Sequence, residues 1–386
     1  MRVLQVSDSL AVDFGGTAAS CAQLANHLAG VGVESSVLTL ANGSSGGPRW
    51  PLDTSVTERV CHPFAPHPLA FCPDLGSVVS SPPRPEVVHV HGLWRLHYLQ
   101  AARFARRSGL PVLVSVHGML HDLALQEKPV PKRIARWLYQ DDLLRHARCL
   151  HVTAKKEADE IRRLGFEGPF AVIPWGVDVP PGDRSGTFSA ASIVEPTTVL
   201  YLGRLTPSKG LEVLLRVWAR IADRFPNARL VVAGSGPESY RDALAALASD
   251  LGVSRSVEWR GPVDGDARER VFREATLLVL PSSYENFGLV AAEALVRGVP
   301  AIATHGSPWS SLIEQSCGWW IPVGVDPLAD ALAEALGRPA DDLRAMGERG
   351  RRFARANFAW DTTARAMRAL YDWLLGHGPA PSFVSA

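Results

Sequence analysis

The chain has 386 residues, of which 46% are hydrophobic and 20% are charged. This length suits two domains with full cores, and the composition excludes a fibrous or disordered protein. The formal net charge of +1 argues against general nucleic-acid binding, because that function needs a strongly basic face.

The five cysteines are odd in number, widely spaced and without a Cys-x-x-Cys pair. This pattern indicates neither a disulfide framework nor a zinc site, so a reducing compartment is expected. The first eight residues lack the apolar core of a signal peptide, and no run of about eighteen apolar residues is present. We therefore predict a cytoplasmic protein with no cleaved leader and no spanning helix.

Short β-branched runs alternate with helical patterns along the chain, which predicts parallel βα units. The first series of predicted strands covers 3–6, 36–40, 87–90, 112–116, 150–153 and 170–173. The second series covers 198–202, 230–233, 257–259, 277–280, 301–304 and 319–321. The predicted fold class is α/β, with two doubly wound, Rossmann-like domains that face each other across a cleft.

Composition also predicts the domain boundaries. The stretch 179–197 has the Pro, Gly and Ser content of a linker, and it separates an N-terminal domain at 1–178 from a C-terminal domain at 198–360. An amphipathic pattern predicts a final helix at 361–376 that packs back toward the N-terminal domain. The small, Pro-rich tail 377–386 is predicted to be mobile.

Two glutamates eight residues apart give the strongest functional signal. Glu293 is the single carboxylate in a mostly apolar helical pattern at 290–296, so we expect it to be shielded from water. Such a carboxylate costs roughly several kcal/mol unless a ribose diol, an arginine or backbone amides donate hydrogen bonds to it. Glu285 precedes the start of that helix, where free amides bind phosphate or hydroxyl groups. The predicted donor-binding residues here are Glu285, Asn286, Phe287, Gly288, Leu289 and Glu293, with Glu285 by the sugar and Glu293 by the ribose.

Two cations meet a helix start in the same half of the chain. Arg204 directly follows the predicted strand 198–202, and Lys209 stands where the next helix opens. Ligands of open parallel sheets bind at the carboxyl ends of strands, and a guanidinium, an ammonium and free amides suit a diphosphate of about two negative charges. We predict that Arg204 and Lys209 hold this diphosphate without a metal, the alternative being an exposed loop with two solvated cations.

The N-terminal half carries weaker signals. Gly15 and Gly16 lie in the first βα loop, where they permit a tight turn or close approach to a ligand; we assign Gly15 to the acceptor side and Gly16 to the donor, against the alternative of a plain loop. His117 ends the predicted strand 112–116 and is expected to meet a sugar hydroxyl or the leaving phosphate, unless it is structural. His89 and His91 share a strand face and are predicted to line the acceptor side; no ligand spacing accompanies them, so no metal site is predicted.

A basic region lies between residues 103 and 163, with thirteen Lys or Arg against seven Asp or Glu. Within it, cations alternate with apolar and aromatic residues over 128–148, a pattern typical of helices that rest on anionic bilayers. This motivates the hypothesis of peripheral contact with the inner face of the plasma membrane. The alternative is an ordinary solvated helix face.

The motifs together resemble the retaining glycosyltransferases of family 4, which have the GT-B fold. The resemblance rests on Gly203-Arg204, Lys209, the Glu285–Glu293 stretch and the Ile173-Pro174-x-Gly176-Val177-Asp178 hinge. It implies that Arg204 and Lys209 hold the donor diphosphate, that Glu285 contacts the sugar, that Glu293 contacts the ribose and that His117 lines the sugar pocket. The implied catalytic set is Arg204, Lys209, His117 and Glu285, with no cofactor.

Three further segments look like the branch found among bacterial exopolysaccharide and surface-glycan enzymes. They are His117-Gly118-Met119-Leu120, Ser307-Pro308-Trp309 and Gly318-Trp319-Trp320. The chain departs from the family at Trp175, where the hinge usually has Asn, and at Ser311, where Glu often follows the Pro-Trp pair. These departures concern local contacts rather than the phosphate site.

The sequence therefore predicts a metal-independent hexosyltransferase that moves a sugar, with retention, from a nucleoside diphosphate donor to a glycan or lipid-linked saccharide in bacterial polysaccharide biosynthesis. Two alternatives remain at this stage. One is a nucleotide-sugar epimerase on the same fold, which would change the donor with no acceptor present. The other is a noncatalytic, hinged sugar-binding protein, which normally needs export.

Overall fold

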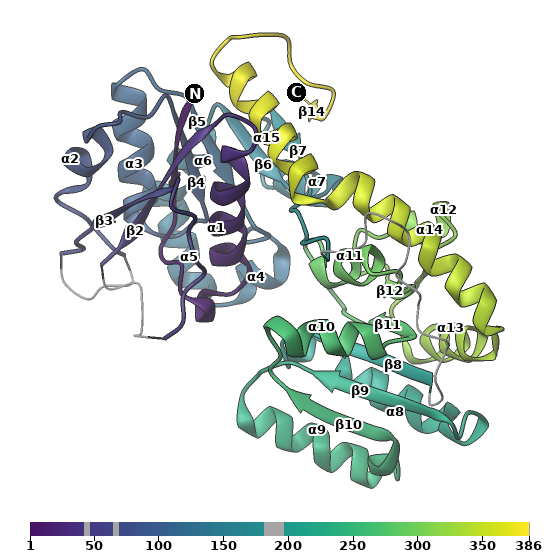
Figure 1. Ribbon diagram of the computed structural model, residues 1–386. Coiled ribbons are helices and arrows are strands. Elements are labelled where there is room, and N and C mark those ends of the chain that lie inside the picture. Colours follow the sequence, from purple (N-terminus) through teal and green to yellow (C-terminus); the bar gives the residue numbers. More distant parts are fainter. Residues whose placement is uncertain (42–46, 65–68, 181–196, 386) are drawn as a thin grey trace. The chain divides into compact units, whose positions relative to one another are not determined.

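The computed structural model describes residues 1–41, 47–64, 69–180 and 197–385 (Figure 1). The chain forms two compact units: the N-terminal unit, of residues 1–176 and 360–386, and the central unit, of residues 177–359. The predicted linker 179–197 lies outside the described residues except at its ends. Each unit is built on one sheet.

The N-terminal unit has an eight-stranded sheet in the order β14-β7-β6-β5-β4-β1-β2-β3, parallel except for β14. Its strands are β1 (Arg2–Val6), β2 (Glu34–Leu40), β3 (Thr57–Cys61), β4 (Val87–His91), β5 (Val112–Ser115), β6 (Cys149–Val152), β7 (Phe170–Val172) and β14 (Val384–Ser385). Its helices are η1 (Val12–Phe14), α1 (Gly16–Ala29), α2 (Leu75–Ser80), α3 (Leu96–Arg107), α4 (Asp122–Gln126), α5 (Pro129–Ala135), the π-helix η2 (Arg136–Gln140), α6 (Asp141–Arg145), α7 (Lys155–Arg163) and α15 (Trp360–Leu374).

The central unit has a six-stranded parallel sheet in the order β10-β9-β8-β11-β12-β13. Its strands are β8 (Thr197–Leu202), β9 (Ala228–Ala233), β10 (Val257–Gly261), β11 (Leu277–Leu280), β12 (Ala301–Thr304) and β13 (Gly318–Ile321). Its helices are η4 (Pro207–Lys209), α8 (Leu211–Ile221), η5 (Ala222–Arg224), α9 (Glu238–Asp250), η6 (Ser254–Ser256), α10 (Gly265–Glu274), α11 (Leu289–Val296), α12 (Ser311–Glu314), α13 (Val325–Gly337) and α14 (Ala340–Phe358).

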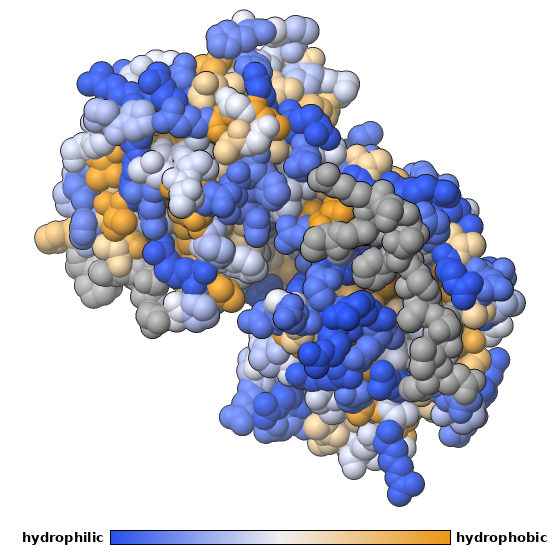
Figure 2. All heavy atoms as spheres, in the orientation of Figure 1, coloured by the Kyte–Doolittle hydropathy of each residue, from blue (hydrophilic) through white to orange (hydrophobic). Residues whose placement is uncertain are grey.

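Both sheets are doubly wound, as the alternating pattern predicts. Strands such as β5 and β11 are buried at every residue, because helices cover both faces of a parallel sheet. Helix α8 shows the covering face well: Leu211, Leu214, Leu215 and Trp218 keep the three-four spacing and are completely buried. On the outside, Figure 2 shows a mainly hydrophilic surface with hydrophobic side chains in small groups.

The last helix, α15, packs on α1 within the N-terminal unit. Its fully buried residues are Ala364, Met367, Leu370 and Tyr371, and the side-chain amide of Gln5 on β1 donates to the Tyr371 hydroxyl at 3.3 Å. The tail beyond α15 differs from the mobile segment that its composition predicts. Instead of remaining unpacked, β14 pairs antiparallel with β7, because the backbone at 383–385 can satisfy the open edge of that strand.

Two other details differ from the sequence prediction. Strand β3 was not predicted, because its sequence is largely polar and only two of its five residues are buried, as suits an edge strand. Thr17 is a residue type that often caps a helix, and its place after the glycine pair predicts such a cap; helix α1 instead begins at Gly16, with Gly15 as the flanking residue and without a side-chain cap. Within the described ranges, every helix is too short or too polar to cross a bilayer.

Candidate active site

The central-unit site lies where the strand order of its sheet reverses, between β8 and β11. Successive strands are added on one side of β8 up to β10, and β11 then pairs on the other side. Such switch points open a crevice at the carboxyl ends of the two strands, where α/β proteins bind ligands. Here the segment that follows β8 carries Arg204 and Lys209, and the segment that follows β11 carries Glu285.

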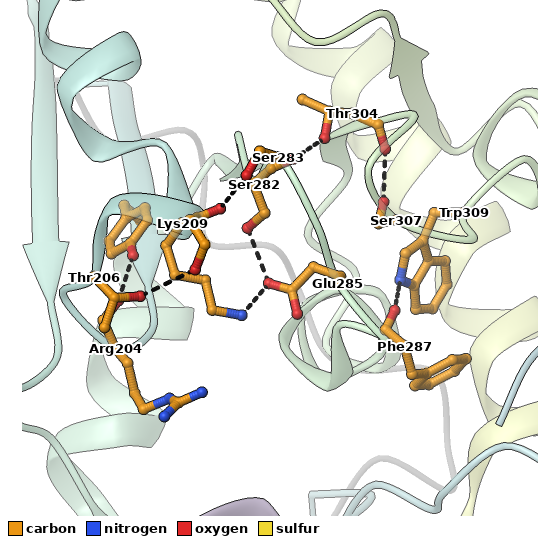
Figure 3. A network of polar contacts seen from close by, with 12 residues as sticks. Arg204, Thr206, Lys209, Ser282, Ser283, Glu285, Phe287, Thr304, Ser307 and Trp309 are labelled. Atoms are coloured by element: carbon orange, nitrogen blue, oxygen red, sulfur yellow. Dashed lines mark hydrogen bonds and ion pairs between the residues drawn. The ribbon is translucent and has the colours of Figure 1, made fainter. Parts of the chain in front are cut away.

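These two segments are joined by a direct ion pair (Figure 3). Lys209 Nζ lies 2.5 Å from Glu285 Oε1, and the Ser282 hydroxyl donates to the same oxygen at 2.9 Å. Glu285 is only 9% exposed, so the lysine compensates a carboxylate that has lost most of its hydration. The structure thus brings together the cation and the carboxylate that the sequence assigns to one site.

Arg204 lies beside this pair. Figure 3 shows its guanidinium on the same side of the loop as the Lys209 ammonium, and within the described residues it makes no hydrogen bond or ion pair. The backbone of Arg204 is fixed instead, because the buried Tyr201 hydroxyl donates to its carbonyl at 2.8 Å. An exposed cation on a fixed backbone is well suited to receive an anionic ligand.

Glycine 210 sets how closely the two segments approach. It has a φ of +71°, and a Cβ at this position would lie 2.1 Å from the Pro281 carbonyl oxygen. The backbone amide of Ser283 also donates to the Ser208 carbonyl at 2.9 Å. The close approach therefore needs a residue without a side chain at 210, and it places Lys209 against Glu285.

The segment from Asn286 to Leu289 leads into α11 as predicted. Gly288 takes a left-handed conformation with φ +80° before Leu289, the first helical residue. Phe287 is buried against Trp309, and the Trp309 indole donates to the Phe287 carbonyl at 2.7 Å. The Phe287 side chain is thus part of the core, so a ligand would meet the backbone of this segment rather than that ring.

Glu293 lies on α11 but is less shielded than its apolar neighbours suggest. Its side chain is 22% exposed, and Arg268 of α10 pairs with it at 2.6 Å. Of the alternatives that the sequence leaves open, the arginine is the donor in this structure. A carboxylate accepts several hydrogen bonds, so the Arg268 pair is compatible with a further contact to a ribose hydroxyl. Arg268 itself was not predicted, because its sequence is that of an ordinary polar helix.

In the N-terminal unit, His117 follows β5 as predicted. Its φ of +56° is unusual for a residue with a side chain, and its ring stacks on Trp175 with centroids 5.2 Å apart. Burial lowers the pKa of His117 to about 3, so the ring is neutral. Its Nε2 is buried and has no hydrogen-bond partner within the described part of the chain.

The prediction for His89 and His91 is wrong. Both side chains are completely buried rather than lining a surface, and the centroids of their rings lie 4.1 Å apart. They are accommodated because the polar side chains of Gln5, Ser115 and Tyr371 surround them with hydrogen bonds. Burial lowers the pKa of both rings well below the usual value, which keeps them uncharged.

The hydrogen bonds around these rings form one chain with a fixed direction. His151 Nε2 lies 2.7 Å from the Ile173 carbonyl oxygen, which can only accept, so this nitrogen carries the proton. The pKa of His151 is lowered to about 4 by burial, so its other nitrogen, Nδ1, is an acceptor. The Ser115 hydroxyl at 2.6 Å must therefore donate to Nδ1, and it accepts in turn from His89 Nε2 at 2.7 Å.

The chain of hydrogen bonds continues across the sheet. His89 Nδ1 accepts from the Tyr371 hydroxyl at 2.8 Å, and that oxygen accepts from the Gln5 amide. The Gln5 carbonyl oxygen then accepts from His91 Nε2 at 2.6 Å. His91 Nδ1 is left as a buried acceptor without a partner in the described residues, and its ring centroid is 5.7 Å from that of His117. One backbone carbonyl thus sets the tautomers of three histidines.

The glycines of the first βα loop have open surroundings. Gly15 has a φ of +67°, and no atom lies within 4 Å of a Cβ built on Gly15 or on Gly16. The conformation explains the glycine at 15. The space beside both positions is compatible with the predicted close approach of a ligand, and the structure adds no contact that assigns one.

The cysteines give a result that the sequence did not suggest. All five are free and buried. Cys61 and Cys72 lie with Asp74 in a group whose donor atoms are all within 4.8 Å of one another, close enough to hold a metal ion. The two thiols are eleven positions apart in the sequence, so no ligand spacing reveals the group.

Comparisons with known proteins identify the family. Residues 187–353 match the model of glycosyl transferases group 1, and residues 15–176 match that of the glycosyl transferase 4-like domain. A D-inositol 3-phosphate glycosyltransferase of Saccharomonospora viridis is 32% identical over 93% of this chain and 89% of its own length. The chain belongs to the group 1 glycosyltransferases. The predicted glycosyltransferase family is confirmed at this level.

Solved structures confirm the fold. Sucrose-phosphate synthase from Thermosynechococcus elongatus matches with a TM-score of 0.75, 23% identity and coverage of 98% of this chain and 100% of that one. Anabaena Alr3699/HepE, solved with UDP and glucose, matches with a TM-score of 0.73, 16% identity and coverage of 97% and 100%. The two parallel α/β units are those of a GT-B glycosyltransferase. The comparisons give no support to the epimerase alternative.

Proposed function

We propose that this glycosyltransferase moves a hexosyl unit from a nucleoside diphosphate sugar, with retention and without a metal ion, to a saccharide acceptor in surface-polysaccharide biosynthesis. The observation that carries the proposal is the convergence of Arg204, Lys209 and Glu285 at the switch point of the central unit. The UDP and glucose bound by Alr3699/HepE support a donor of this class.

The charges suggest how the donor is held. A diphosphate competes with Glu285 for Lys209 and is also reached by the exposed Arg204. When the lysine turns to the phosphate, Glu285 keeps the hydrogen bond from the Ser282 hydroxyl and can accept another hydrogen bond from a hydroxyl group of the sugar. Glu293 would accept from the ribose while it remains paired with Arg268. In this way both carboxylates act as hydrogen-bond acceptors for hydroxyl groups, and neither is needed as a nucleophile.

The chemical step requires stabilisation of a leaving diphosphate. Positive side chains already oriented toward the developing charge lower the barrier, because they need little reorganisation during the reaction. Two cations supplied by the protein fill the role that a divalent ion has in other transferases. Retention follows if the leaving phosphate takes the proton of an acceptor that attacks from the same face.

The first experiment combines donor and acceptor screens. Purified protein is incubated with UDP-, GDP- and ADP-hexoses and with a polyprenyl diphosphate saccharide, with a chelator present, and the product anomer is determined by nuclear magnetic resonance. We expect a retained linkage with one of the donors. An inverted linkage, a strict need for a metal, or an epimerised donor without an acceptor would each contradict the proposal.

A second acceptor belongs in the same screen. The relatives named D-inositol 3-phosphate glycosyltransferases cover almost the whole chain, so D-inositol 3-phosphate is the competing acceptor. Transfer to it in preference to the lipid-linked saccharide would replace the polysaccharide role by a cyclitol-modifying one. The donor site would be unaffected by that outcome.

The surface of α5 and η2 supports a membrane-bound acceptor. Four apolar side chains are largely exposed there: Val130, Ile134, Trp137 and Leu138, with Trp137 83% exposed. The cations Lys128 and Arg133 are exposed beside them. Apolar side chains flanked by cations suit the boundary of an anionic bilayer, and we propose that this surface rests on it.

Vesicle sedimentation tests this contact. We expect the protein to pellet with phosphatidylglycerol vesicles at low salt and Trp137→Ser to reduce the pelleted fraction several-fold, because an exposed indole anchors at such boundaries. Ile313→Ser is the matched control, since Ile313 is 55% exposed on the central unit. Equal pelleting of Trp137→Ser and the parent protein would reject the contact.

A further inference from the structure

The N-terminal unit has a switch point of its own, between β1 and β4. Strand β1 pairs with β2 on one side and with β4 on the other, and Val6 stands opposite Val90. The carboxyl ends of these strands lead into Asp8 and into the segment from Gly92 to Arg95. By the rule that places ligands at such reversals, this is the position for a second ligand site.

A charged group occupies the position. Asp8 Oδ2 lies 3.3 Å from Arg95 Nε, and Asp8 Oδ1 lies 3.4 Å from His97 Nε2. His97 is completely buried, whereas the side chains of Asp8 and Arg95 are 18% and 30% exposed. A ligand can therefore reach the outer edge of the Asp8–Arg95 pair but not the histidine.

The carboxylate is incompletely satisfied. Asp8 Oδ1 is buried, and within the described residues no group donates to it with hydrogen-bond geometry. Burial raises the pKa of Asp8 to about 6, and Arg95 opposes that rise. A partly buried carboxylate with spare accepting capacity costs stability unless a ligand or a water molecule donates a hydrogen bond to it.

The backbone that presents Arg95 is strained and held from outside. Trp94 has a φ of +74°, a conformation that costs about 1–3 kcal/mol in a residue with a side chain. Its amide donates to the Gln140 side-chain carbonyl at 2.7 Å, and the Tyr139 hydroxyl donates to its carbonyl at 2.7 Å. Both partners belong to η2, a π-helix, and such turns are common at functional sites.

We propose that Asp8 and Arg95 bind the acceptor through adjacent hydroxyl groups on its ring. Asp8 accepts from one hydroxyl, and Arg95 donates to the oxygen next to it. This chemistry fits saccharides and cyclitols alike, so it holds for either acceptor considered above. The inference rests on the proposed transferase function. It assigns the acceptor-binding site, which that function requires, to the N-terminal unit.

The π-helix gives the site a connection to the surface. Trp137 and Leu138 are exposed on η2, whereas Tyr139 and Gln140 are buried and hold the Trp94 backbone. One short element thus faces outward with the apolar surface described above and inward with the support of Arg95. Tyr139 and Gln140 are positioning residues for acceptor binding.

Steady-state kinetics with D-inositol 3-phosphate and with a polyprenyl diphosphate saccharide test the site. For whichever acceptor the parent protein uses, we expect Asp8→Asn and Arg95→Gln to raise the acceptor KM about 10- to 100-fold, as for the loss of a charge-assisted hydrogen bond. The affinity for nucleoside diphosphate, measured by calorimetry, should stay within about twofold of the parent. Tyr139→Phe should raise the acceptor KM less, about three- to tenfold, with little change in kcat.

The controls separate this inference from the function itself. Asp53→Asn, an exposed carboxylate elsewhere in the unit, should leave both constants unchanged. If the parent protein transfers to neither acceptor, the proposed function fails in its acceptor class and the inference fails with it. If it does transfer and folded Asp8→Asn and Arg95→Gln both keep the parent KM, the inference alone is overturned. Arg95→Gln decides the matter if Asp8→Asn does not fold, because Arg95 is the more exposed partner.

Discussion

The two switch points of this glycosyltransferase carry different chemistry. In the central unit, Arg204 and Lys209 stand with two carboxylates that are paired to cations, so the site is rich in charge. At the switch point of the N-terminal unit, the Asp8–Arg95 ion pair lies against His97, which burial keeps neutral by lowering its pKa to about 3. The difference fits the proposed division of roles: several charges suit a diphosphate, whereas one ion pair beside a neutral histidine suits hydroxyl groups.

The largest expected effect concerns the charged side. Lys209→Ala removes one phosphate ligand and leaves Glu285 with only the Ser282 hydroxyl, so kcat/KM should fall by about two to three decades, or about 3–4 kcal/mol in transition-state stabilisation. Arg204→Ala should behave similarly. Turnover is measured at saturating acceptor.

Arg216→Ala is the control for that pair, because Arg216 is an exposed cation on α8, the helix that follows Lys209. Its activity should equal that of the parent protein. If Arg204→Ala and Lys209→Ala both turned over at near-normal rates, the assignment of the phosphate site to the charged switch point would have to be abandoned.

The second effect concerns backbone approach. Gly210→Ala should lower the free energy of unfolding by about 3 kcal/mol, because the added Cβ would meet the Pro281 carbonyl at 2.1 Å and the φ of +71° is itself unfavourable. Gly109, in the N-terminal unit, has a φ of +73° but open space around a Cβ. Gly109→Ala should therefore cost only about 1 kcal/mol. If urea unfolding gave the same loss of unfolding free energy for Gly210→Ala and Gly109→Ala, the contact with Pro281 would not determine the conformation of the loop at Gly210.

The third effect concerns the neutral side and pH. The folded-state pKa of His151, about 4, lies below its ordinary value of 6.5, so the unfolded state binds the proton more readily. Stability is therefore lost as the pH falls below about 6.5, by about 2 kcal/mol for such a histidine between pH 7 and pH 5. Replacing it, as in His151→Asn, should make the free energy of unfolding less sensitive to pH by that amount.

Asp8 works in the opposite direction over part of this range. Its folded-state pKa of about 6 lies above the ordinary value, so the folded state binds the proton first and gains stability as the pH falls from 6 toward 4.

For the His151→Asn experiment, His62→Gln serves as the control, because the His62 side chain is 73% exposed. An unchanged pH dependence in His151→Asn would mean that this histidine is not neutral in the folded chain.

The smallest effect tests the ribose contact. Glu293→Gln should weaken nucleoside diphosphate binding about five- to tenfold, because a charge-assisted hydrogen bond to the ribose becomes a neutral one. Glu269→Gln is the matched variant, since Glu269 forms a similar pair with Arg297 in the same unit. Calorimetry that gave the same dissociation constant for Glu293→Gln and the parent protein would remove Glu293 from the donor site.

Much of the central-unit site could be predicted because each of its residues closely follows a strand that the hydrophobic pattern reveals. Arg204 follows β8 and Glu285 follows β11, and a parallel sheet places the carboxyl ends of its strands along one edge. Arg268 could not be predicted in the same way, since its partner Glu293 lies on another helix, 25 positions along the chain.

The prediction for His89 and His91 was wrong for a different reason. A polar residue in a β-branched strand indicates a surface or a ligand when the sequence is considered alone, and nothing near His89 announces Tyr371, 282 positions away. Only packing of α15 into the N-terminal unit brings that hydroxyl to the imidazole. Asp8 and Arg95 were missed likewise, because their pairing depends on which strands are neighbours at the switch point.

The sequence by itself determined the alternating elements, the two parallel sheets and the strand ends that carry Arg204, Lys209 and Glu285, because hydrophobic period and chain direction are local properties. The tertiary structure decided which polar groups meet: the buried histidine chain, the Arg268–Glu293 pair, the Asp8–Arg95 pair and the pairing of the tail with β7. Hydrogen bonds and ion pairs depend on distances between groups that are remote along the chain, and only the folded packing sets those distances.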